Sequence, residues 1–205
     1  INSVPETKLE KYLDGIKDKD LLLSKLSFSN TRKQFDRVFY SILGLEDGQI
    51  GFGVMDKDVM AFVSDCKELN EDTIENANRL VAQLNLICED DTIPVNYISC
   101  NARAIKFLLL LMSLDLVDFS QDKKRKLKAL DAINKKLSAF SSAKADSVSE
   151  TFHGYSDPVI EEYRLLALIS KGGHSLKRVQ NRMEILAYYV NDFSNQTKPS
   201  GIQPI

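Results

Sequence analysis

The sequence is poor in residues that interrupt helices and in residues that build crosslinks. Its 205 residues include 5 prolines, 9 glycines and 3 cysteines. So little proline and glycine excludes collagen-like and low-complexity disordered classes. The cysteines, Cys66, Cys88 and Cys100, are odd in number and lack C-x-x-C spacing, which argues against a disulfide framework. We therefore expect a reducing, intracellular environment, either the cytoplasm or a nucleoid or nucleus.

Long apolar runs and recognisable motifs for chemistry are also missing. The longest apolar run, Phe107 to Met112, is far shorter than the roughly 20 residues that span a bilayer. His153 and His174 are the only histidines, and neither has a cysteine or a second histidine nearby in the sequence. There is no G-x-S-x-G motif and no complete glycine-rich phosphate loop. The sequence predicts no membrane span, metal site, cofactor or catalytic residue.

Helical periodicity is what the sequence does contain. Apolar residues between Phe35 and Leu45 recur at steps of three and four, which is typical of an amphipathic helix. The segment from Ala104 to Val117 is apolar almost all round, which predicts a helix in the centre of the fold. We expect an all-α fold, a single compact domain of about seven to nine helices around this central helix. Glycines near Gly48 to Val54 predict at most a minor β element.

The charge is unevenly divided along the chain. Residues 1–100 contain 11 Lys and Arg against 18 Asp and Glu, whereas residues 101–205 contain 16 against 11. We expect one helical domain over 1–205, with the alternative of an acidic subdomain 1–118 and a basic subdomain 119–193 followed by a polar tail, 194–205. The Ser-rich segment 141–157 lacks periodicity and predicts a flexible connector or a subdomain boundary. Opposite charges on the two halves are compatible with a basic and an acidic partner-facing surface, and equally with head-to-tail self-association into a homo-oligomer.

Two C-terminal segments carry most of the positive charge. Seven Lys and Arg lie between Lys123 and Lys136, and four lie between Lys171 and Arg182. If the two helices pack side by side, their outer faces form one patch that can neutralise several phosphates. Aromatic residues are not interleaved with the basic ones, which argues against a stacking platform for single strands. The predicted anion-binding residues are Lys123, Lys124, Arg125, Lys128, Lys135, Lys177, Arg178 and Arg182.

The stretch "LLALISKGGHSLKRVQNRMEIL" resembles the first two helices of a helix-turn-helix or winged-helix DNA-binding domain. The resemblance rests on the glycine-containing turn and on Ser175, which would cap the second helix. It covers about a tenth of the chain and implies a DNA-binding fold. In that family a recognition element follows, whereas here one apolar stripe continues from Leu176 to Phe193. No DNA-contacting role is therefore transferred to residues of this chain.

These patterns favour a non-enzymatic helical module that binds polyanion, with nucleic-acid backbone as the expected partner. Self-association would strengthen such binding through multivalency. The alternative is a protein-interaction or scaffold module that uses its acidic and basic faces. A helical enzyme with a dispersed site is the third interpretation.

Overall fold

A computed structural model of the chain describes residues 34–48, 56–65, 69–93, 102–140, 145–168 and 176–192, together with Lys11, Asp14, Gly15, Leu21 and Ser24. Within these residues all regular structure is helical, as the sequence predicts. The described helices are α3 (Gln34–Glu46), α4 (Asp56–Asp65), α5 (Glu71–Cys88), α6 (Ala102–Ser113), α7 (Lys123–Ala139), α8 (Ala145–Thr151), α9 (Asp157–Leu168) and α10 (Leu176–Asn191).

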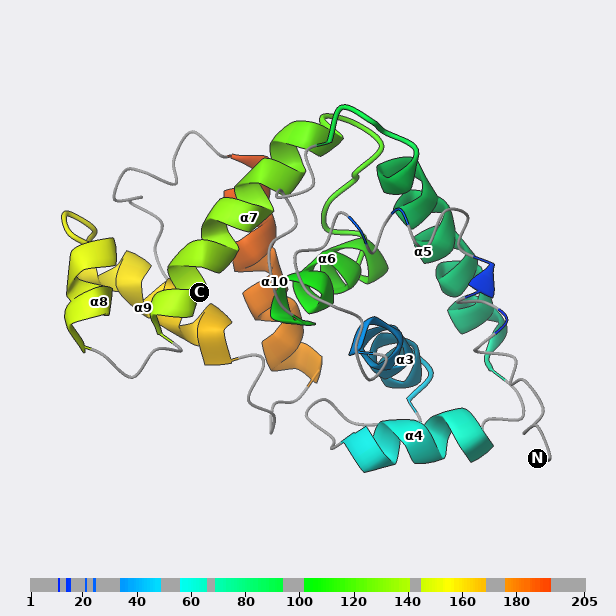
Figure 1. Cartoon of the computed structure of the whole chain (residues 1–205). Coiled ribbons are helices and arrows are strands. Elements are labelled where there is room, and N and C mark those ends of the chain that lie inside the picture. Colours follow the sequence, from blue (N-terminus) through cyan, green and yellow to red (C-terminus); the bar gives the residue numbers. More distant parts are fainter. Residues whose placement is uncertain are drawn as a thin grey trace.

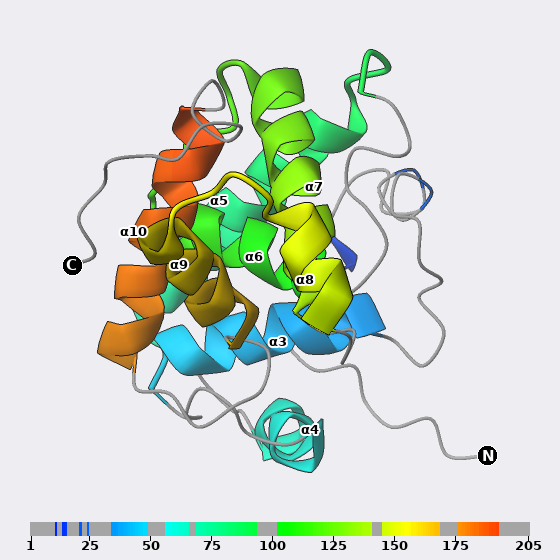
Figure 2. The same cartoon turned by 90° about the vertical axis from the view of Figure 1, so that its left-hand side faces the viewer.

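The central helix predicted from the sequence is confirmed as α6, which ends at Ser113 and not at Val117 as predicted. Its residues from Phe107 to Met112 are at most 1% exposed, because apolar side chains point in every direction around the helix axis. Helices α3, α5, α7 and α10 all pack against it. Figures 1 and 2, which differ by a quarter turn, both show α6 in the middle of the helices.

The remaining helices complete a single hydrophobic core that extends from Phe35 in α3 to Val190 in α10. Helix α4 packs on α3, at the lower side of Figure 1, and α9 packs between α7 and α10. Tyr163 of α9 and Tyr189 of α10 stack with ring centroids 5.2 Å apart. The apolar stripe predicted for α10 is confirmed from Val179 to Val190, and the side chains of Leu176 and Phe193 lie outside the described residues.

Helix α6 ends in a turn of defined geometry. The amide of Asp115 donates to the carbonyl of Met112, and the amide of Leu116 donates to the carbonyl of Leu111. This pair of hydrogen bonds is the Schellman motif, in which the residue after the cap takes a left-handed conformation. Asp115 has φ of +54°, where glycine is the usual residue. The aspartate side chain has a second role at this position, because it forms an ion pair with Arg79.

Two segments that the sequence predicts to be irregular differ in how far the structure describes them. The Ser-rich segment is predicted to be a flexible connector or a subdomain boundary. It contains the short helix α8, so the prediction of a connector without regular structure is wrong for residues 145–151. Val148 and Phe152 explain the helix, since they pack against the core and Phe152 contacts Phe140 and Tyr163. Of the predicted β element, Gly48 lies in a turn and residues 49–54 lie outside the described residues. None of the helices in the described ranges is long and apolar enough to cross a membrane.

Candidate functional site

Three of the predicted basic residues are exposed lysines on the outer face of α7. Positions 124, 128 and 135 lie within about 40° of one another around the helix axis, at 100° per residue. All three side chains are exposed, and that of Lys135 is 63% exposed. Lys124 and Lys128 form no ion pair with any described residue. We call Lys124, Lys128 and Lys135 the lysine ridge.

The first turn of α7 has a different role, because its basic side chains bind the ends of neighbouring helices. The Lys123 ammonium donates to the carbonyl of Leu86 near the end of α5, at 3.0 Å. Arg125 donates to the carbonyl of Asn191 at the end of α10, at 2.8 Å. Carbonyls at helix C-terminal ends carry partial negative charge, which cations stabilise. These two basic residues thus join α5 and α10 to the start of α7 (Figure 1).

Acidic side chains also engage this end of α7. Lys123 lies 3.1 Å from the Asp90 carboxylate, and Arg125 lies 3.6 Å from that of Asp122. Hydrogen bonds from Thr92, followed by the contact with Lys123, lower the pKa of Asp90 to about 2. Both ion pairs are partly exposed, so each contributes little to stability, about 0–1 kcal/mol. Their main effect is to hold Lys123 and Arg125 against the protein.

One lysine of the ridge and two further lysines of α7 make contacts within the fold. Lys135 of the lysine ridge forms an ion pair at 2.6 Å with Asp131, which is 7% exposed. Lys126 is 9% exposed and donates to the carbonyl of Asp118. Lys136 donates to the hydroxyl of Tyr155, with its ammonium over the Tyr155 ring. A large part of the basic charge of α7 therefore serves the protein's own packing.

The structure brings α7 and α10 together, as the predicted basic patch requires, but it changes the contribution of α10. Arg182 is 9% exposed, so the prediction that it lies on an exposed shoulder is wrong. Its position explains the burial, since it follows Val179 by three residues and precedes Leu186 by four, on the edge of the buried stripe. The side chains of Lys177 and Arg178 lie outside the described residues.

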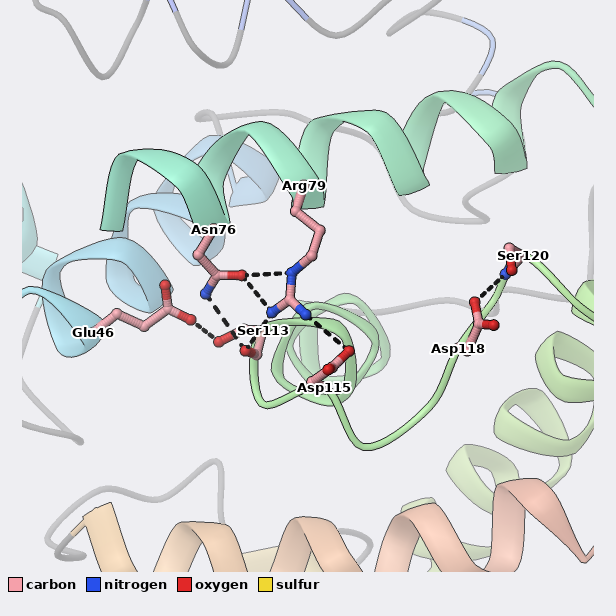
Figure 3. A network of polar contacts seen from close by, with 7 residues as sticks. All are labelled: Glu46, Asn76, Arg79, Ser113, Asp115, Asp118 and Ser120. Atoms are coloured by element: carbon pink, nitrogen blue, oxygen red, sulfur yellow. Dashed lines mark hydrogen bonds and ion pairs between the residues drawn. The ribbon is translucent and has the colours of Figure 1, made fainter. Parts of the chain in front are cut away.

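A second polar cluster, which the sequence analysis missed, lies where the ends of α3 and α6 meet α5 (Figure 3). Arg79 donates to the Ser113 carbonyl at 3.0 Å and to the Asn76 side chain at 2.6 Å, and it lies 2.8 Å from Asp115. Ser113 in turn donates its hydroxyl to Glu46. Nearby in Figure 3, the Asp118 carboxylate accepts from the Ser120 amide in a short turn. The contacts of Arg79 and Ser113 join elements far apart in sequence.

The same face of α5 borders a hollow of about 630 Å³, lined by Asp72, Glu75, Asn76 and Arg79 among the described residues. The carboxylates of Asp72 and Glu75 and the guanidinium of Arg79, which is already bonded within the protein, do not indicate which ligand the hollow would bind. The described residues also contain no group of three or more His, Cys, Asp or Glu that could hold a metal ion. A sequence signal for the polar cluster did exist, since Asn76 and Arg79 lie one turn apart, but it does not indicate which helix end they meet.

Comparisons with known proteins add no assignment: no protein family, curated protein or solved structure matches this chain.

Proposed function

We propose that the chain is a non-enzymatic helical module that binds polyanion, with nucleic-acid backbone as its ligand, through the lysine ridge of α7. The observation that carries the proposal is the alignment of Lys124, Lys128 and Lys135 on one exposed face. Lys124 and Lys128 make no ion pair with a described residue, so no such pair must break when a phosphate binds. Arg125, with 44% of its side chain exposed, lies beside the same face.

The dimensions of the lysine ridge suit a chain of phosphates better than a single anion. At 1.5 Å per residue, Lys124 and Lys135 lie about 16 Å apart along the helix axis. A nucleic acid offers regularly spaced negative charges over such a length, and neutralising them releases counterions. The three lysines provide charge without bidentate geometry or base stacking, which favours sequence-independent binding of micromolar or weaker affinity.

Replacing Lys124 and Lys128 by Glu is expected to weaken binding by about tenfold or more at low salt, because two attractive charges become repulsive. Fluorescence anisotropy with labelled single- and double-stranded oligonucleotides measures the effect. The matched control is Lys57→Glu with Arg164→Glu, which makes the same charge change on the exposed surfaces of α4 and α9. The control is expected to bind like the wild type. Equal loss in both variants would indicate a response to net charge and would contradict a site on α7.

A second candidate, a protein-interaction module, is favoured by apolar side chains on the helices that meet the start of α7. Leu86 of α5 and Tyr188 of α10 are 41% and 39% exposed. Exposed aromatic and aliphatic side chains near basic residues are common at protein interfaces. A partner with an acidic face would use the same lysines. Pull-down with and without nuclease separates the two candidates, because a protein partner survives nuclease treatment and a nucleic-acid-bridged partner does not.

A further inference from the structure

The C-terminal ends of α3 and α6 meet at one carboxyl group, that of Glu46. Glu46 is the last residue of α3, and it accepts a hydrogen bond from the hydroxyl of Ser113, the last residue of α6. Figure 3 shows both side chains beside Asn76 and Arg79 of α5. One step further along the chain, the Asp47 carboxylate accepts from the Asn70 amide at the start of α5, at 2.7 Å. The end of α3 is thus attached to both neighbouring helices.

This is an unfavourable place for a negative charge. The last carbonyls of a helix carry partial negative charge, and Glu46 lies where two such ends converge. Its Oε2 atom is buried, and no described donor reaches it with hydrogen-bond geometry; the nearby Asn76 amide offsets only part of the cost of burial. Of the elements packed against α3, α5 contributes the cation Arg79, and the turn after α6 contributes the anion Asp115, which already pairs with Arg79.

We infer that Glu46 is a pH-sensitive latch, whose neutral form holds the ends of α3 and α6 together beside α5 and whose ionised form releases the end of α3. A neutral carboxyl group can stay in this buried place and keep its contact with Ser113. A carboxylate gains more from water than the junction offers, because burial of an ion is costly unless it is well paired. This property is separate from the lysine ridge, because it involves the ends of α3 and α6 and the side of α5, and no residue of α7.

The pKa of Glu46 is consistent with this geometry. Burial raises the pKa from 4.5 to about 7, against the smaller opposing effects of the Asn76 amide and the Arg79 guanidinium. Between these two values the closed junction binds a proton that the open one has lost. Stability of the junction is therefore full below about pH 4.5 and falls as the pH rises towards about 7. With a pKa of about 7 in the closed junction and of 4.5 in the open one, the equilibrium constant for opening is predicted to rise about tenfold between about pH 6 and pH 8.

Hydrogen exchange of the backbone amides, measured by NMR on the full chain, tests the latch. The reporters are Asp47 and Gly48, whose amides close the end of α3, and Asn70, whose amide is bonded to Asp47. After correction for intrinsic exchange, their opening is expected to rise about tenfold from about pH 6 to pH 8 in the wild type. Glu46→Gln mimics the neutral acid and should remove this rise. The control Glu161→Gln, at an exposed site on α9, should keep it.

Direct titration of the Glu46 carboxyl carbon by NMR gives a second readout that needs no variant. An inflection near 7 supports the latch, whereas an inflection near the ordinary value of 4.5 overturns it. The same pH dependence of exchange in the wild type and in Glu46→Gln would also overturn it. If Glu46→Gln does not fold, the wild-type titration decides the question.

Discussion

Met183→Asp is expected to leave the chain largely unfolded. Met183 is fully buried in α10, on the stripe that faces α6, α7 and α9. An aspartate there would bury a carboxylate among apolar side chains without a cation or hydrogen-bond donor to pair with it, or force the helix away from the core. Such a change costs more than about 4 kcal/mol, a large part of the stability of an ordinary domain. Circular dichroism and urea denaturation measure the loss.

The control for this prediction is Gln180→Asp, which puts the same residue on the exposed side of the same helix. It is expected to shift the stability by less than about 1 kcal/mol. A Met183→Asp variant with the helical signal and urea midpoint of the wild type would show that α10 does not pack through its apolar stripe.

Leu109→Ala is expected to lower the free energy of unfolding by about 2–5 kcal/mol. Leu109 is fully buried in α6, and neighbouring Leu110 is 1% exposed, so truncation of either leaves a cavity that surrounding helices cannot easily fill. Leu110→Ala should behave similarly. The urea midpoint reports the change, provided that the slope of unfolding free energy against denaturant stays constant.

Leu86→Ala is the matched control, because it makes the same chemical change at a side chain 41% exposed on α5. It is expected to cost clearly less than truncation in α6. Unchanged midpoints in both Leu109→Ala and Leu110→Ala would place the centre of the fold elsewhere.

Periodicity was sufficient to predict the helices that make the core. The all-round apolar segment became α6, and the stripe from Val179 to Val190 became the buried face of α10. Both signals are local, since a helix's own spacing decides which side chains share a face. Helix α8 was missed because seven residues are too few for a clear period, and its stability comes from tertiary contacts of Val148 and Phe152.

Which basic side chains bind other parts of the protein was harder to predict from the sequence. Lys123 and Arg125 look like part of a solvated basic face in the sequence, yet both donate to carbonyls at the ends of other helices. Nothing local to α7 specifies those partners. Arg182 could have been recognised, because its spacing from Val179 and Leu186 puts it on the buried stripe. The junction at Glu46 could not be recognised from the sequence, since it forms only where the ends of α3 and α6 meet the side of α5.

In several places in this fold, a basic side chain donates a hydrogen bond to a carbonyl at the C-terminal end of another helix. Arg79 donates to the Ser113 carbonyl at the end of α6, and Arg103 donates to the carbonyl of Leu137 near the end of α7. Together with Lys123 and Arg125, they bind carbonyls in the last turns of helices, where partners within the helix run out. The basic excess of the C-terminal half is therefore partly structural, and among the described residues the lysine ridge is the part that we propose as the contact surface.

The salt dependence of nucleic-acid binding tests the proposed function most directly. Binding of duplex DNA through three lysines predicts a slope of log affinity against log salt of about −2.7. Lys124→Gln with Lys128→Gln, which removes two charges without adding repulsion, should reduce the slope to about −1, and the fold should be unchanged by circular dichroism. Absence of binding to the wild type even at low salt, or a slope that the double variant leaves unchanged, would contradict the lysine ridge as a polyanion site.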